Sequence, residues 1–189
     1  MGETSPDNRL KHLVDDCRKG KLDSQKELYK QFYGYAMGIC LRYSQNREEA
    51  KEIVNDGFLK IFAHIRDQRE ERSFKAWLRK IMIHASIDYF RRNEKYYGQS
   101  EISPFIKDLS VTDGNAALSE QEILRLVQLL PPAYRMVFNL YAIEGYKHHE
   151  IAEMTGTTVG TSKSNLAKAR LRLKEMLYTI DRDRFEKYG

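Results

Sequence analysis

The chain has few prolines, cysteines and tryptophans, and it lacks the alternating patterns of β-strands. Its 189 residues include 4 prolines, 2 cysteines and 1 tryptophan. Cys17 and Cys40 lie within apolar helical patterns, without a CxxC motif or a His/Cys cluster, so we expect buried reduced thiols and no metal site. β-branched residues do not alternate over long runs, which argues against a sheet.

Long apolar runs are also lacking. The opening MGETSPDNRLKH has no apolar signal-peptide core, and no run approaches the roughly 20 apolar residues of a membrane span. We therefore expect a cytoplasmic protein without membrane insertion. The sequence contains no P-loop, no βα catalytic pattern and no cluster of metal ligands. We predict that it is not an enzyme and that it has no cofactor and no small-molecule substrate.

Charged residues and helical periodicity are abundant. Hydrophobic residues make up 41% and charged residues 31% of the chain, which is typical of a soluble helical protein. The formal net charge of +5 suits a polyanionic partner, although it does not establish one.

Apolar residues at helical spacing predict helices along most of the chain. We expect a helix from Leu10 to near Gly20, a second that Ser24 caps, a third from Asn46 to about Ile65, and a fourth that Ser73 caps after the loop 66–73. Periodicity fails at 98–117. It resumes at Ser119, whose SEQE is a capping box, and continues in a helix over 133–142 after Pro131-Pro132.

The break in periodicity predicts two domains. We expect an all-α protein in which two small helical domains are joined by a flexible linker. The predicted ranges are 8–97 for the first domain, 98–117 for the linker, 118–180 for the second domain and 181–189 for a tail.

The stretch 144–174 predicts a helix-turn-helix. Gly156 permits a tight turn, and Thr157 or Thr158 can cap the second helix. At roughly 100° per residue, one side of that helix is apolar and the other is polar and basic. The alternative is an ordinary amphipathic helix with a solvated basic face. The apolar side contains Val159, Leu166, Ala169, Leu173 and Leu177, and the polar side contains Lys163, Ser164, Ala167, Lys168 and Lys174.

The third and fourth helices each carry a second candidate surface. Opposite its core stripe, the third helix places Leu59 among acidic and amide residues, which indicates a docking surface or a solvated face with one stray leucine. The fourth helix mixes basic and aromatic residues, a pattern typical of nucleic-acid contact. Phe74 and Trp77 belong to the core in the simpler interpretation.

Three stretches together resemble the extracytoplasmic-function (ECF) group of bacterial sigma-70 factors. They are EEAKEIVNDGFLKIFAHI (48–65), SFKAWLRKIMIHASIDYFRR (73–92) and EGYKHHEIAEMTGTTVGTSKSNLAKAR (144–170). The resemblance implies sigma region 2 and sigma region 4 joined by a linker that passes near the polymerase catalytic cleft. It also implies three partners: the clamp coiled coil of the largest subunit of core RNA polymerase, promoter DNA and an anti-sigma factor.

The resemblance also implies roles for particular residues. The first stretch would bind the polymerase clamp through Glu52, Asn55, Asp56 and Leu59. The second, with the loop before it, would capture melted −10 bases through Arg69, Arg72, Ser73, Lys75, Lys80 and His84, while Arg91 and Arg92 would hold the upstream backbone. The third would read the −35 element through Lys163, Ser164, Ala167 and Lys168, with Thr161, Asn165 and Arg170 nearby.

Three positions depart from the family pattern. Family members often have Asn at the position of His84, an apolar residue at Ser162 and Arg at Asn165. His84 would change the preferred melted base, and the other two indicate a −35 preference that the sequence does not define.

Two other functions remain as alternatives. A stand-alone helix-turn-helix regulator would bind duplex DNA tightly without polymerase, and it would leave the basic aromatic helix unexplained. A recombinase or nuclease would need a catalytic motif. The HHE run at 148–150 is the nearest approach to a metal site, but adjacent histidines do not share a side of a helix, so we expect exposed polar residues there.

Overall fold

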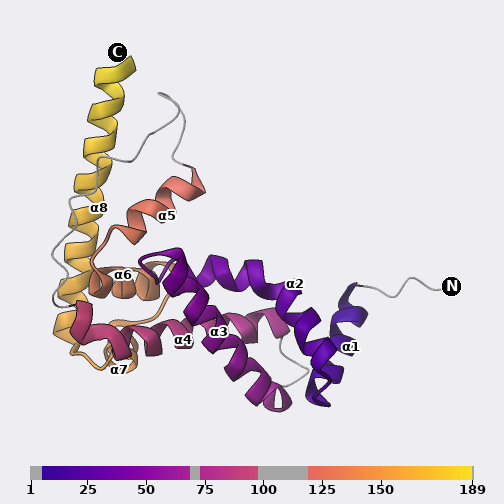
Figure 1. Cartoon of the computed structure of the whole chain (residues 1–189). Coiled ribbons are helices and arrows are strands. Elements are labelled where there is room, and N and C mark those ends of the chain that lie inside the picture. Colours follow the sequence, from indigo (N-terminus) through magenta and orange to yellow (C-terminus); the bar gives the residue numbers. More distant parts are fainter. Residues whose placement is uncertain (1–5, 69–72, 98–118, 189) are drawn as a thin grey trace. The chain divides into compact units, whose positions relative to one another are not determined.

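The computed structural model of the chain describes residues 6–68, 73–97 and 119–188 (Figure 1). Every regular element in these ranges is helical, which confirms the predicted all-α class. No helix in these ranges is long and apolar enough to cross a membrane. The chain divides into two compact units, Met1–Cys40 with Glu48–Ser86 and Leu41–Arg47 with Ile87–Gly189. The predicted linker 98–117 lies outside the described residues, and the predicted domain boundaries stay predictions.

The first unit is built from helices that bury one stripe each. Its aromatic core includes an edge-on contact between Phe32 and Phe74, whose ring centroids are 5.2 Å apart. Cys17 and Cys40 are buried as predicted, and burial, reinforced by Asp16, raises the pKa of Cys17 to about 11. The elements are α1 (Pro6–Arg18), α2 (Leu22–Cys40), α3 (Arg47–His64), the 3-10 turn η1 (Ile65–Asp67) and the first part of α4 (Phe74–Tyr97).

Arg18 joins the end of α1 to the turn that follows α3. Its Nη2 donates hydrogen bonds of 2.7 Å to the backbone carbonyl and to the side-chain oxygen of Gln68. Its Nε donates to the carbonyl of Ile65 at 3.4 Å, and Arg66 returns a bond of 3.1 Å from its Nε to the Arg18 carbonyl. These bonds satisfy backbone groups where helical hydrogen bonding ends.

The second unit contains the remaining helices. Ser119 and Glu122 form the predicted capping box at the start of α5. Pro131 and Pro132 open α6, where a missing N–H costs least. A buried cluster of Leu126, Leu130, Ala169, Met176 and Ile180 joins α5 to α8. The elements are α5 (Glu120–Gln128), α6 (Pro132–Phe138), the π-helical turn η2 (Asn139–Ile143), α7 (His148–Thr155) and α8 (Val159–Tyr188).

Some local predictions are wrong. The second helix begins at Leu22, so Ser24 lies inside its first turn and does not cap it. Val159 and Leu177, which we assigned to the apolar side of the last helix, are 41% and 37% exposed. Helix α8 continues through most of 181–189, and the assignment of this range to a tail stays a prediction.

Helices α3 and α4 approach closely at a glycine. A Cβ atom on Gly57 would lie 2.4 Å from the sulfur of Met82 and 2.8 Å from its Cε. Met82 is fully buried, so its terminal atoms have little room to move. Glycine at this position therefore permits the α3–α4 contact.

We predict opposite effects for alanine at two helical glycines. Gly34→Ala in α2, where no atom lies within 4 Å of the new Cβ, should raise the free energy of unfolding by about 0.5–1 kcal/mol. Gly57→Ala should lower it by about 1 kcal/mol, because overpacking outweighs the gain in helix propensity. Denaturant unfolding of the full chain measures both values. Stabilisation by Gly57→Ala would contradict this account.

Candidate functional site

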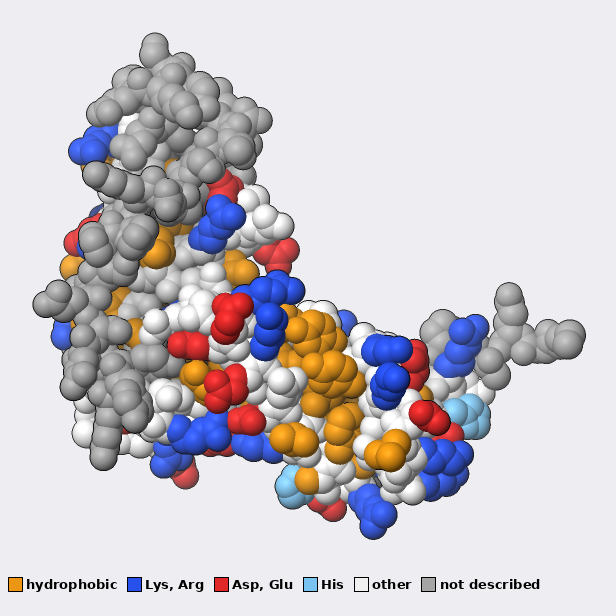
Figure 2. Space-filling view, viewed as in Figure 1, with side chains coloured by type: hydrophobic (Ala, Val, Ile, Leu, Met, Phe, Trp, Pro, Cys, Tyr) orange, Lys and Arg blue, Asp and Glu red, His pale blue; other side chains and the backbone are white. Residues whose placement is uncertain are grey.

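The predicted docking face lies on α3, opposite that helix's buried stripe, and consists of Glu52, Asn55, Asp56 and Leu59. Ala50, Ile53 and Val54 are at most 1% exposed, which fixes the rotation of the helix. Leu59 is 69% exposed, Glu52 and Asn55 are exposed, and Asp56 is half-buried. Figure 2 shows hydrophobic side chains gathered over α2 and α3. An exposed leucine beside carboxylates and an amide is suited to protein contact.

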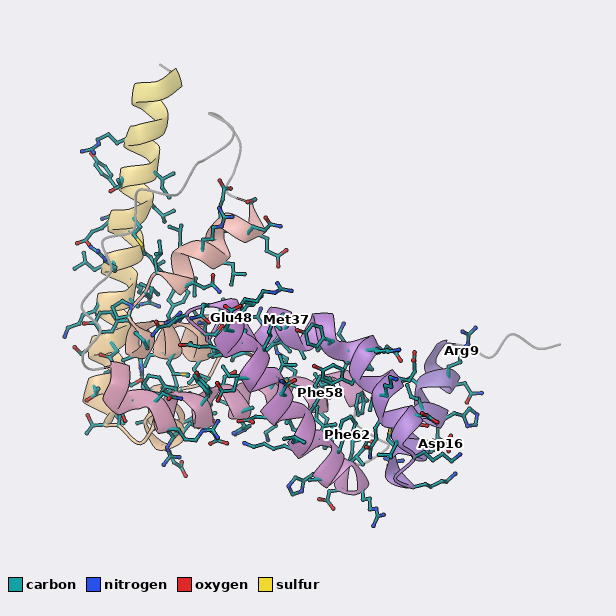
Figure 3. All side chains as sticks on the ribbon, viewed as in Figure 1. Arg9, Asp16, Met37, Glu48, Phe58 and Phe62 are labelled. Carbon is teal, nitrogen blue, oxygen red and sulfur yellow. The ribbon has the colours of Figure 1, made fainter. Side chains whose placement is uncertain are left out.

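Helix α2 adds aromatic residues that sequence reasoning missed. The hydroxyl of Tyr29 donates a 3.0 Å hydrogen bond to Oδ1 of Asn55. The Tyr29 ring packs on Phe58 and Tyr33, with centroid distances of 4.6 and 5.4 Å, and Phe58 is followed one turn later by Phe62 (Figure 3). Burial, reinforced by Tyr33, raises the pKa of Tyr29. The i, i+4 spacing of Tyr29 and Tyr33 was the available signal.

The −10 candidates on α4 fall into two groups. Ser73 lies just before the helix, where its carbonyl accepts the N–H of Trp77 at 3.1 Å. At roughly 100° per residue, Ser73, Lys80 and His84 fall within about 40° of one another, and all three are exposed. Lys75 is exposed on a different side, where its ammonium lies 4.5 Å from the ring centre of Tyr35. The helix therefore places Ser73, Lys80 and His84 on one side and Lys75 on another.

The remaining −10 candidates are two pairs of arginines. Arg69 and Arg72 are outside the described residues. Arg91 and Arg92 are exposed near the end of α4, and the Arg92 guanidinium lies 5.9 Å from the ring centre of Tyr89. Trp77, which we assigned to the core, is half-buried and packs on Phe74 at 5.7 Å between ring centroids.

The predicted turn of the helix-turn-helix is present. Gly156 ends α7 with a φ of +71°, a conformation that L side chains rarely adopt. Thr158 caps α8, because its Oγ1 accepts the N–H of Thr161 at 3.0 Å. Thr157 instead bonds to Thr155 through the two hydroxyls. The structure thus selects Thr158 from the two predicted caps.

Helix α8 exposes most of the predicted −35 residues. Leu166 and Ala169 are buried as predicted and hold the helix on the second unit's core. Three of the exposed residues have neighbours within the unit. The Thr161 hydroxyl lies 2.9 Å from that of Thr158, the Lys168 ammonium lies 5.9 Å from the ring centre of Tyr134, and the Arg170 guanidinium lies 5.7 Å from that of Tyr141. Thr161, Lys163, Ser164, Ala167, Lys168 and Arg170 are exposed, and Asn165 is half-buried.

Beneath α8 lies a contact that sequence reasoning missed. Ser162 is fully buried, and its Oγ lies 2.9 Å from Nδ1 of His148. The expectation of exposed polar residues at 148–150 is therefore wrong for His148 and Glu150, which are half-buried, and right for His149. Among the described residues, no group of His, Cys, Asp or Glu is arranged to hold a metal ion.

A left-handed glycine turn followed by a capped helix with an exposed polar and basic stripe defines a helix-turn-helix DNA-binding protein. The family model "Sigma-70 region 2" matches residues 28–96, and "Sigma-70, region 4" matches residues 120–173. The chain belongs to the sigma-70 family, in its ECF group. It is an RNA polymerase sigma factor, and it directs promoter-specific transcription initiation.

Curated relatives align over most of the chain. RNA polymerase sigma factor YlaC of Bacillus subtilis is 27% identical over 162 residues, which cover 81% of this chain and 91% of that protein. ECF RNA polymerase sigma factor SigW of Bacillus subtilis is 26% identical over 185 residues, covering 89% and 96%. The sigma factor RpoE of Bartonella quintana, solved with the anti-sigma factor NepR, is 22% identical with a TM-score of 0.49, covering 81% and 96%.

The capping geometry of α8 leads to a prediction about stability. Thr158→Ala should lower the free energy of unfolding by about 1 kcal/mol, because the Thr161 N–H loses its acceptor. Thr158→Ser keeps the hydroxyl and should retain most of that stability. Thermal unfolding of the full chain measures the difference. An equal loss for both variants would show that the cap hydrogen bond is not the cause.

Proposed function

We propose that this sigma factor works through three surfaces and performs no covalent chemistry itself. The docking face on α3 binds core polymerase, α8 reads the −35 element, and α4 with the loop before it holds the melted −10 strand. The observation that carries the proposal is that α3 and α8 each bury one stripe and leave most of the candidate residues exposed on the other side. We assign residues 8–97 to polymerase and −10 binding, 98–117 to a linker near the catalytic cleft, and 118–180 to −35 binding.

Polymerase binding is assigned to the docking face because it combines acidic groups with an exposed leucine. Buried apolar contact supplies affinity, while charges set orientation and association rate. The hydrogen bond from Tyr29 holds the Asn55 side chain in one orientation, so less conformational entropy is lost on binding. We therefore include Tyr29 as a positioning residue for this face.

Promoter opening is assigned to α4 because its exposed stripe supplies polar and basic groups next to the loop 66–73. Extruding a base from the duplex costs a few kcal/mol, which contacts to the flipped base and to the backbone must offset. Ser73, Lys80 and His84 lie on one stripe and are suited to the captured bases. Arg91 and Arg92, farther along the helix, are suited to upstream phosphates, and Lys75 contributes from another side.

Duplex recognition is assigned to α8. Lys163, Ser164, Ala167 and Lys168 lie on one exposed arc, and phosphate contacts from Thr161, Asn165 and Arg170 would fix the register. Lysine and serine side chains can hydrogen-bond to base edges in the major groove.

Location and regulation follow from the proposed activity. We propose that the protein acts in the cytoplasm, because core polymerase and promoter DNA must both be reached. We also propose that an anti-sigma factor holds it inactive, since the family resemblance implies such a partner. Covering the docking face and α8 together would block both polymerase and promoter binding.

Charge reversal on the docking face tests the polymerase assignment. The double variant Glu52→Lys with Asp56→Lys should reduce promoter-dependent transcripts about tenfold or more in a run-off assay with purified core polymerase, because two favourable charges become repulsive. The matched control, Asp23→Lys with Glu27→Lys, reverses two charges at the same i, i+4 spacing in α2 and should leave output near wild type. Normal output from the Glu52 and Asp56 variant would refute the docking face.

Truncation of Lys163 tests the −35 assignment. Lys163→Ala should relax base choice at one or more −35 positions, with a loss of discrimination of about 1–3 kcal/mol. Selection of promoters by the holoenzyme from a randomised −35 library measures the preference. Lys26→Ala in α2 makes the same change in charge and serves as the control. A promoter profile identical to wild type would remove Lys163 from the base-reading set.

A further inference from the structure

A column of polar and aromatic side chains begins and ends on α8. The buried hydroxyl of Ser162 lies 2.9 Å from Nδ1 of His148, and either group can donate, depending on the histidine tautomer. The His148 ring stacks on Tyr141, with ring centroids 4.6 Å apart and an interplanar angle of 23°. The guanidinium of Arg170 lies 5.7 Å from the centre of the Tyr141 ring. Ser162 and Arg170 both belong to α8, whereas His148 and Tyr141 precede the turn.

The position of Ser162 links this column to the exposed arc of α8. Ser162 points into the protein, and Lys163 and Arg170 project roughly 100° and 80° away from it around the helix axis. Any rotation of α8 about its axis therefore moves all three residues together. A rotation of roughly 10° moves an atom about 6 Å from the axis by about 1 Å. That displacement exceeds the spread of normal hydrogen-bond lengths, so it is enough to lose a base contact.

A hydrogen bond restrains this rotation in a way that an apolar contact does not. Apolar side chains can slide past one another at little cost, whereas a hydrogen bond weakens steeply with distance and angle. Because Ser162 is fully buried, rotation that separates it from His148 would also leave a polar group without its partner. Buried polar pairs can specify one arrangement even when their net effect on stability is small.

We propose that His148 and Ser162 are positioning residues for −35 recognition, and that Tyr141 extends the same restraint to Arg170. Their hydrogen bond sets the rotation of α8 against α7 and so aims Lys163 at the base edges. Ser162 is buried and does not itself meet DNA. This inference rests on the proposed function of α8 as the −35 reader. It assigns the unusual serine to orientation of the helix and not to direct base readout.

The experiment compares variants in the holoenzyme. Full-length variants are assembled with core polymerase, and affinity is measured for a promoter chosen from the randomised library and for the same promoter with a scrambled −35 element. Ser162→Ala and His148→Leu should each reduce the ratio of these affinities about three- to tenfold, as expected for one lost hydrogen bond. His148→Asn keeps a polar group near the position of Nδ1 and should recover most of the ratio. His149→Leu, at the exposed neighbouring histidine, is the matched control and should change nothing.

The double variant tests whether the two residues act through each other. Ser162→Ala combined with His148→Leu should reduce the ratio no further than His148→Leu alone, since the change at His148 already removes the bond to Ser162. Additive losses, an unchanged ratio in the single variants, or equal harm from His148→Asn and His148→Leu would each overturn the proposal. Equal losses on both promoters together with a lower melting temperature would also overturn it, because they indicate general destabilisation.

Lys163→Ala, measured in the same assay, separates this inference from the proposed function. A changed ratio for Lys163→Ala with no change for Ser162→Ala overturns only the positioning role. An unchanged ratio for Lys163→Ala removes base reading from α8, and the proposed function then fails together with the inference.

Discussion

The rotation of each helix about its own axis is the constraint on which the candidate surfaces depend. Side chains leave an α-helix at about 100° intervals, so burying one stripe determines which residues face outward. On α3, burial of Ala50, Ile53 and Val54 leaves Glu52, Asn55 and Leu59 exposed. On α8, Leu166 and Ala169 have the same effect for Lys163 and Ser164. The way each helix packs on the core therefore also determines which of its residues can contact a partner. A change that rotates a helix alters both.

Hydrogen bonds restrict the orientation of helices and side chains more narrowly than apolar packing does. Tyr29 holds Asn55 beside the exposed Leu59, and His148 holds Ser162 beneath the exposed arc of α8. In both cases the residue that provides the restraint lies on a different helix from the residue it restrains. Each bond contributes only about 1 kcal/mol to stability, yet it selects one side-chain or helix orientation among several of similar energy. For recognition, a single orientation matters more than the added stability, because contacts to a partner are lost at displacements of about 1 Å.

Helices and their outer faces could be predicted from sequence because both depend on local spacing. The capping box at Ser119, the turn at Gly156 and the buried stripe of α3 all arise from residues within a few positions of one another. The wrong predictions concern residues whose exposure depends on neighbours that are distant in sequence. Val159 has helical spacing with Leu166 but is exposed at the start of α8. His148 is half-buried and lies within hydrogen-bonding distance of Ser162, fourteen residues away. No periodicity in the sequence reports such neighbours, so the proposed roles of Tyr141 and Ser162 follow only from the fold.

The distribution of charge imposes a further condition on a protein that must bind both DNA and another protein. The chain carries a net charge of +5, yet the docking face contains Glu52 and Asp56. Carboxylates close to phosphates would weaken DNA binding, whereas lysines among them would weaken an acidic docking surface. In the proposed assignment the two functions fall on different helices, with the acidic candidates on α3 and the basic candidates on α4 and α8. At physiological ionic strength exposed charges interact strongly over only about 8 Å, so the sign of each proposed surface depends mainly on the charges within that distance of it. The chain can thus be basic overall while its proposed docking face is acidic.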